Sequence, residues 1–230
     1  MESQTQVKYT CLFCEKDFCR EQSLVVHVCE QKKRFQERDE RGVQLGLQAY
    51  LRFYEITQGS ARLKSWEDFT KSAYYRAFVK FGRYCVDARV ISPGRFMDWL
   101  IKNNKKIDHW CRDSLYDEYL TAYVRMEAAE DALARALEAA LTWSEQTGYP
   151  SADYLRHGND NAICHAITKG SVTAWILYNC DSGHEFLDRI TSEQIAMIWP
   201  YIDSESWQRR FRDYPSDQEY LKQMLQKAGW

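Results

Sequence analysis

The sequence lacks the features that mark membrane and secreted proteins. None of its apolar runs approaches the length that a membrane-spanning helix needs, and no signal-peptide pattern stands at its start. We therefore expect a soluble, intracellular protein of the cytoplasm, with no membrane partner. At 230 residues, with 45% hydrophobic and 14% aromatic residues, the chain is long and apolar enough to bury a sizeable core.

Motifs that mark common catalytic sites are also absent. There is no Walker loop, no Gly-x-Ser-x-Gly, no His-Glu-x-x-His and no acidic motif with two-metal spacing. His109 beside Trp110, and His165 within "AICHAI", are better explained as packed side chains than as catalytic bases. The sequence therefore predicts that the protein is not an enzyme.

Period-two strand patterns are scarce, whereas signals for helix starts are frequent. Ser65-x-x-Asp68 has the pattern of a capping box, and Ser92 stands before a proline that suits the first turn of a helix. Thr191-x-x-Gln194 repeats the capping pattern. We expect these positions to open helices.

The longest helical pattern is rich in Ala, Leu and Glu. It predicts one helix from Leu115 to about Thr147, ending before Gly148. A later helix is expected to stop at Pro200. The predicted fold class is all-α: a multi-helix body with one long central helix, preceded by a small ββα module.

Cysteine is unevenly distributed along the chain. Four of the eight cysteines fall in "KYTCLFCEKDFCREQSLVVHVCEQKKR", which runs from Lys8 to Arg34. The remaining four are scattered and are best explained as small buried apolar residues: Cys85, Cys111, Cys164 and Cys180.

The cysteine-rich stretch resembles the two-cysteine, two-histidine zinc-finger family up to its first histidine. Cys11-x-x-Cys14 precedes His27 by twelve intervening residues, and aromatic and leucine residues stand at the positions that build the family's small core. These core positions are Tyr9, Phe18 and Leu24. The resemblance implies that Zn²⁺ orders a unit too short to bury enough apolar surface alone.

The fourth ligand departs from the family pattern. The nearest candidate after His27 is Cys29, and two residues along a helix point about 200° apart. Both can bind one ion only if the helix ends or unwinds at His27. Cys19 is the rival fourth ligand, although its position beside Phe18 is awkward. The predicted metal ligands are Cys11, Cys14, His27 and Cys29.

The finger carries few residues suited to reading DNA sequence. At the family's base-contacting positions stand Arg20, Ser23 and Val26, of which only Arg20 suits guanine. The basic residues that follow could contact phosphates without sequence preference: Lys32, Lys33 and Arg34. The valine-rich finger helix fits packing against a protein better.

Charge is unevenly distributed behind a net charge of −2. Residues 52–112 hold thirteen Lys/Arg and six Asp/Glu, whereas residues 113–230 hold ten and nineteen. A basic middle and an acidic C-terminal half suggest an anionic partner for the first and a protein partner for the second. The alternative is a solvated surface of mixed charge.

The basic middle also interleaves cations with aromatic residues. Predicted nucleic-acid contacts in this segment are Arg76, Lys80, Arg83, Lys102, Lys105 and Lys106. Cations that follow a phosphate backbone, with aromatic faces for the bases, suit single-stranded or forked nucleic acid. Alternatively, the aromatic residues belong to the core and the basic residues face solvent.

Segments of the helical body resemble the helicase-loader family of T4-like tailed phages. The resemblance covers about Ser72–Phe211 and rests on "AYYRAFVKFGRYC", "FMDWLIKNNKKIDHW", a long charged helix and "NDNAICHAITKGSVTAWILYNC". It implies an all-helical protein that binds forked or single-stranded DNA and recruits a replicative helicase, in the host cytoplasm if a phage encodes it. The family begins with a small helical DNA-binding domain, whereas this chain begins with the finger.

These observations predict three segments and two candidate functions. The segments are a zinc-finger module (1–34), a charged helical linker (35–60) and an all-helical body (61–230). The first function is a phage-type nucleic-acid-binding accessory protein of replication or transcription, similar to helicase loaders. The alternative is a zinc-finger adaptor that binds a host polymerase or virion component without touching DNA.

Overall fold

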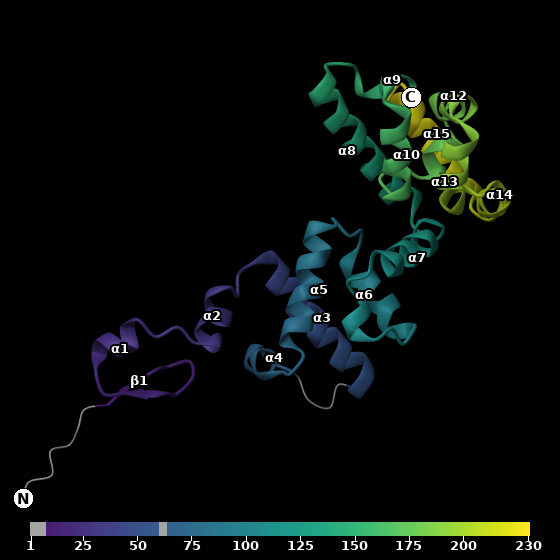
Figure 1. Ribbon diagram of the computed structural model, residues 1–230. Coiled ribbons are helices and arrows are strands. Elements are labelled where there is room, and N and C mark those ends of the chain that lie inside the picture. The colour runs from purple at the N-terminus through teal and green to yellow at the C-terminus, as the bar shows by residue number, and fades with distance from the viewer. Residues whose placement is uncertain (1–7, 60–63) are drawn as a thin grey trace, which may run out of the picture. The chain divides into compact units, whose positions relative to one another are not determined.

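The computed structural model describes residues 8–59 and 64–230, which divide into two compact units (Figure 1). One unit runs up to Arg112 and the other starts at Asp113. The described residues are mainly helical, and their one sheet is a two-stranded hairpin near the N-terminus. The predicted all-α class with a small strand-containing finger is thus confirmed. Within the described ranges, no helix combines the length and the apolar character that crossing a membrane requires.

The described part of the first unit contains the finger and the five α-helices that follow it. Its elements are β1 (Tyr9–Thr10), β2 (Asp17–Phe18), α1 (Glu21–Val25), α2 (Glu30–Gln36), α3 (Arg41–Gln58), α4 (Trp66–Lys71), α5 (Tyr75–Asp87), α6 (Pro93–Lys102) and a 3₁₀ turn (Ile107–His109).

The second unit consists of helices joined by short connections. They are α7 (Asp113–Val124), α8 (Ala129–Thr147), a 3₁₀ turn (Ser151–Asp153), α9 (Tyr154–His157), α10 (Asp160–Thr168), α11 (Ala174–Leu177), α12 (Asp181–Arg189), α13 (Ser192–Ile202), α14 (Ser204–Asp213) and α15 (Pro215–Lys227).

The core of the first unit is built on close packing of α3 against α5. A methyl group added at Gly82 would lie 1.9 Å from the Gly42 carbonyl oxygen, and one added at Gly46 would lie 2.7 Å from the Phe78 carbonyl oxygen. The two backbones therefore approach closely because these positions lack side chains. Beside this contact, Trp110 is fully buried and its ring packs edge-on against Phe78.

This packing changes the interpretation of residues 35–60. The sequence predicts a charged linker there, whereas α3 is a core helix whose Val43 and Ala49 are fully buried. The finger and the following helices up to Arg112 belong to one compact unit, so the structure divides the chain at a different place from the predicted segments. Glycine in α3 allows its close packing against α5.

The predicted helix from Leu115 to Thr147 is wrong as a single element. It is split into α7 and α8 by residues 125–128. Glu127 lies in this break with a fully buried side chain, and its carboxylate pairs with Arg135 one to two turns into α8. Arg210 donates to the Glu127 carbonyl at 3.1 Å. Tertiary contacts of the break thus override the helix propensity of the segment.

Two of the three predicted caps form as expected. Ser65 and Thr191 each make a full capping box, with the residue three positions later reaching back to the cap. Ser92 precedes α6, but it adopts a left-handed conformation and its side chain makes no capping bond. Ser92 thus holds the N-cap position and the helix starts at Pro93 as expected, but the side chain does not cap it.

The predicted stop at Pro200 is also wrong, because α13 continues through it to Ile202. A proline inside a helix leaves the carbonyl four residues earlier without its N–H partner. That residue is Ala196, and both it and Pro200 are exposed. Water can therefore satisfy the carbonyl, which lowers the cost of continuing the helix.

Candidate metal centre and nucleic-acid interface

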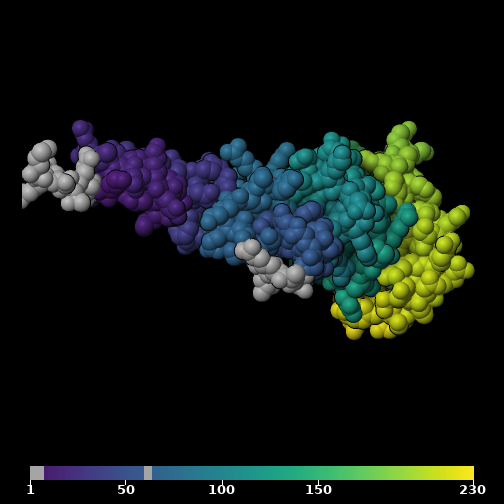
Figure 2. All heavy atoms as spheres, turned by 90° about the horizontal axis from the view of Figure 1, so that it is seen from below, coloured from purple at the N-terminus to yellow at the C-terminus, as the bar shows by residue number. Residues whose placement is uncertain are grey.

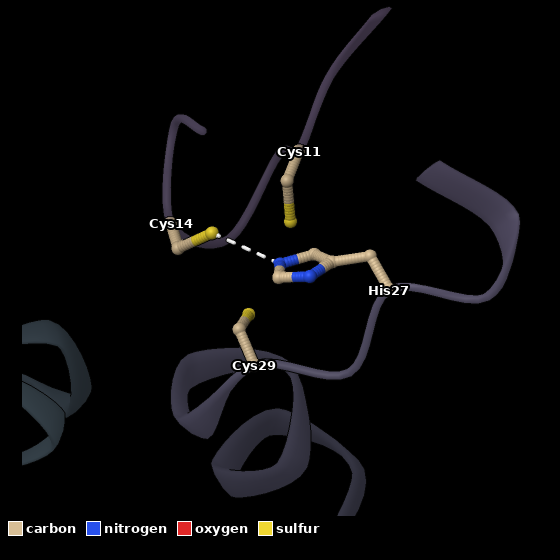
Figure 3. Close-up of side chains that lie close together, drawn as sticks. All are labelled: Cys11, Cys14, His27 and Cys29. Atoms are coloured by element: carbon tan, nitrogen blue, oxygen red, sulfur yellow. Dashed lines mark hydrogen bonds between the residues drawn. The ribbon is translucent and has the colours of Figure 1, made fainter. Parts of the chain in front are cut away.

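Four side chains near the N-terminus converge on one point (Figure 3). Their ligand atoms, three thiol sulfurs and one imidazole nitrogen, all lie within 4.8 Å of one another. They are the four predicted ligands: Cys11, Cys14, His27 and Cys29. The Cys14 Sγ lies 3.3 Å from the His27 Nε2. This cluster could hold a metal ion.

The hairpin positions the first two thiols. Tyr9 pairs with Phe18 across the two short strands, and the connecting turn is closed by the Cys11 amide donating to the Lys16 carbonyl at 2.9 Å. Glu15 has a positive φ of 58°, which reverses the chain just after Cys14. The turn therefore directs both sulfurs to the same side.

The other two ligands come from the segment between two helices. Helix α1 ends at Val25, so His27 lies outside it, and its ring packs 4.8 Å from the Phe18 ring. Cys29 is the N-cap of α2, where its Sγ accepts from the Lys32 amide at 3.4 Å. The helix ends before His27, as a Cys29 ligand requires.

Cys19 does not belong to the cluster. Its side chain is exposed, whereas Cys11 is 3% exposed and the other cluster members are half-buried. Of the two fourth ligands that the sequence leaves open, the structure places Cys29 with the other three.

The chemistry of the cluster suits a closed structural metal site. The backbone amides of Phe13 and Cys14 lower the pKa of the Cys11 thiol, which favours the thiolate that binds metal. Three sulfurs and one imidazole are a donor set typical of tetrahedral structural sites, in which all four positions belong to the protein.

The finger lies against the following segment of its unit (Figure 2), where the Phe13 and Phe35 rings are 5.1 Å apart.

The predicted basic residues of the finger region have different surroundings. Arg20 is exposed at the start of α1, and Lys33 of α2 lies 3.9 Å from Glu37, the residue just after that helix. Lys32 reaches back to the His27 carbonyl at 3.5 Å. These three cations therefore lie on or near the surface of the finger and α2.

Arg34 has an internal role in the first unit. Its side chain is 14% exposed, it donates to the Thr70 carbonyl and to Glu30, and its guanidinium lies 4.2 Å from the centre of the Tyr75 ring. This arginine therefore joins α2 to α4 and α5.

The predicted cations of α5 face the carboxylates near α2. Arg76 lies 3.3 Å from Glu30, and Arg83 pairs with Glu37 and Glu40. These pairs were not predicted, because the partners are more than forty residues apart in sequence. The sequence hints at these pairs only in that Glu30, Glu37 and Glu40 lie close together along one short segment. Lys80 is exposed between the two arginines.

The third group of predicted cations follows α6. Lys102 ends that helix, Lys105 lies 5.2 Å from the Trp99 ring centre, and Lys106 is exposed. Lys105 and Lys106 line a hollow of about 460 Å³. Aromatic residues form much of its wall: Phe53, Tyr54, Tyr74 and Phe78.

The aromatic residues of the basic segment divide between core and surface. Phe78 and Phe81 are fully buried, Tyr84 is half-buried, and Tyr74 is 52% exposed. Sequence reasoning did not identify Phe53 and Tyr54, which come from α3 and reach the hollow only through the α3–α5 packing.

The charge division coincides with the boundary between the units. Residues 1–112 carry twenty-one Lys/Arg and fourteen Asp/Glu, whereas residues 113–230 carry ten and nineteen. The predicted protein partner of the acidic half stays a prediction.

Comparisons with protein-family models, with curated proteins and with solved structures found no match. The resemblances to two-cysteine, two-histidine fingers and to helicase loaders therefore remain predictions, which rest on the sequence motifs alone.

Proposed function

We propose that this chain is a nucleic-acid-binding accessory protein whose first unit contacts single-stranded DNA. The observation that supports this best is the hollow between α3, the start of α5 and the segment after α6. There, the rings of Phe53, Tyr54 and Tyr74 adjoin Lys105 and Lys106. Aromatic faces beside cations are the combination that binds bases and phosphates together.

The size and composition of the hollow support this function. At about 460 Å³ it falls within the range of small-ligand sites, so one nucleotide fits. Tyr74 is half-exposed and is thus available to stack on a base. The net positive charge of this unit would add attraction for a polyanion, and the acidic second unit would be left for a protein partner.

We further propose that the ion of the finger is Zn²⁺ and that its role is structural. The four donors are typical zinc ligands, and the strands of the hairpin have only two residues each. So small a unit gains most of its order from the metal. A place in phage replication, such as helicase loading, follows from the resemblance alone and belongs to the same proposal.

Oligonucleotide binding over a salt series tests the proposed function. We expect a fluorescent oligo-dT strand to bind the wild type, with log K falling linearly as log salt rises. A Lys105→Gln/Lys106→Gln variant should bind more weakly and have a shallower slope, by about 0.7 for each lost phosphate contact. Tyr74→Ala should weaken binding by about tenfold or more through lost stacking.

A matched control removes two lysines from the acidic unit, Lys222→Gln/Lys227→Gln. Its oligonucleotide affinity and salt slope should equal those of the wild type. Absence of binding by the wild type at low salt, or equal effects of the two lysine pairs, would contradict the proposal.

Exposed apolar side chains on the finger favour a second candidate function, that of a protein-interaction adaptor. Leu12 is 93% exposed, and Val25 and Val26 are 70% and 76% exposed. Affinity capture with a Val25→Ser/Val26→Ser variant tests this function, with exposed Gln22→Ser on the same helix as control. An adaptor should lose a polymerase or virion partner only in the valine variant, whereas an unchanged set of partners would count against it.

A further inference from the structure

A second hollow in the first unit lies between α2 and α5 and has a volume of about 580 Å³. Five cations line it: Lys33, Arg34, Arg76, Lys80 and Arg83. The carboxylates along it are fewer: Glu30, Glu37 and Asp87. Glu40, which does not line the groove, also pairs with Arg83. Five cations therefore face four carboxylates, and the groove keeps a net positive charge.

The arginines of this groove are held by carboxylates of the α2 segment. Glu30 accepts from Arg34 at 3.0 Å and lies 3.3 Å from Arg76, so one carboxylate serves two guanidinium groups. Lys80 has no carboxylate within ion-pair distance among the described residues. The cations thus exceed the anions that the fold itself provides.

The floor of the groove holds a further hydrogen-bond donor. Tyr75 is 5% exposed, and its hydroxyl has no hydrogen-bond partner in the described part of the chain. The Nε of Arg34, stacked over the same ring, likewise has none. Buried donors without partners are costly, and they are rare unless a ligand or water completes them.

We propose that the groove between α2 and α5 is a binding site for a phosphate group. Phosphate oxygens would accept from Lys80 and Arg76 at the rim and from the Tyr75 hydroxyl at the floor. Glu30 occupies the arginines when phosphate is absent and competes with it, because both anions use the same guanidinium donors. The natural ligand would be a phosphate of a nucleic-acid backbone, and this assignment rests on the proposed function.

Calorimetric titration of the full chain with sodium pyrophosphate, at constant ionic strength, tests the site. We expect binding at one site. Lys80→Gln and Tyr75→Phe should each weaken it by about tenfold, the factor of one hydrogen bond to a charged group. Glu30→Gln should strengthen it severalfold, because the neutral amide holds the arginines less tightly. A purely structural groove would not gain affinity from that change.

Two controls keep the lysine and tyrosine changes interpretable. Lys71→Gln and Tyr220→Phe alter exposed side chains outside the groove and should bind pyrophosphate as the wild type does. Circular dichroism must show that each groove variant is folded. No binding by the wild type, wild-type affinity in both Lys80→Gln and Tyr75→Phe, or no gain in Glu30→Gln would overturn the site.

Competition with the oligo-dT strand distinguishes the source of the phosphate. If pyrophosphate displaces the strand and Lys80→Gln weakens both, the groove holds backbone phosphate. If pyrophosphate binds in the groove while the strand does not bind the protein at all, the groove is a site for a small phosphate compound. The proposed function then fails, whereas the groove inference holds. If the strand binds but pyrophosphate does not, the groove inference alone fails.

Discussion

Arg83 of α5 and Glu40, the residue just before α3, form a two-point ion pair. Nε donates to one carboxylate oxygen at 2.8 Å and Nη2 donates to the other at 2.7 Å. Together with the pairs made by Glu30, this contact joins the α2 segment to α5. The metal cluster precedes the same segment, because Cys29 is the N-cap of α2. Metal centre, α2 and groove are therefore parts of one continuous structure.

Acid should weaken this connection. Arg83 lowers the pKa of Glu40, and Arg34 and Arg76 lower that of Glu30. A carboxyl whose pKa is lower in the folded state contributes stability above its unfolded pKa, about 4.3, and this contribution is lost as pH falls through the folded pKa. We expect a Glu30→Gln/Glu40→Gln variant to lose stability near neutral pH and to depend less on pH below about 4.3.

Urea unfolding from pH 3 to pH 7, followed by circular dichroism, measures this difference. Glu145→Gln is the control, because Glu145 is exposed on α8 and makes no ion pair among the described residues. Parallel pH profiles of the wild type and the double variant would disprove the stabilising role of the two glutamates.

Removal of the metal should disorder the finger and spare the second unit. Cys14→Ser and Cys29→Ser should each bind zinc far more weakly, because a closed four-ligand site loses one thiolate. Cys19→Ser should retain one zinc per chain, since its thiol lies outside the cluster. Elemental analysis gives the stoichiometry, and amide NMR shows which residues lose order. A metal-free wild type with an ordered finger, or zinc loss in Cys19→Ser, would refute the assigned ligands.

Gly82→Ala should be among the most damaging small substitutions in the first unit. The added methyl group would lie 1.9 Å from the Gly42 carbonyl oxygen, so α3 and α5 must separate. Overpacking of this kind costs about 1–3 kcal/mol, and more when backbone must move. Gly94→Ala on α6 is the matched control, because an added methyl group there meets nothing within 4 Å. Thermal unfolding of both variants decides the prediction, and equal midpoints would contradict it.

The buried pair of Glu127 and Arg135 should be costly to break from one side. Arg135→Met would leave a fully buried carboxylate without its guanidinium partner, at a cost of about 3–5 kcal/mol. Glu127→Leu/Arg135→Met should recover much of that loss, because neither charge remains. Arg156→Met, which breaks a more exposed pair with Glu185, should cost about 1 kcal/mol or less.

Denaturant unfolding of these variants measures the free-energy differences. A double variant that is less stable than Arg135→Met would show that the break between α7 and α8 depends on the ion pair itself.

The sequence by itself determined the helical class, three of the four residues of the candidate metal cluster and several helix starts. These features depend on neighbours within a few residues: the spacing of Cys11 and Cys14, the capping pattern at Ser65 and the periodicity of apolar positions. Local chemistry decides them whatever the rest of the chain does.

Tertiary structure alone decided where the helices break and what the cations face. Propensity predicts one helix through Glu127, but the helix breaks at residues 125–128, where Arg135 pairs with the buried Glu127 carboxylate and Arg210 donates to the Glu127 carbonyl. The sequence likewise presents Arg76 and Arg83 as free cations, yet carboxylates more than forty residues away form ion pairs with them. Such outcomes depend on which distant groups the fold brings together, and no short pattern in the chain encodes that information.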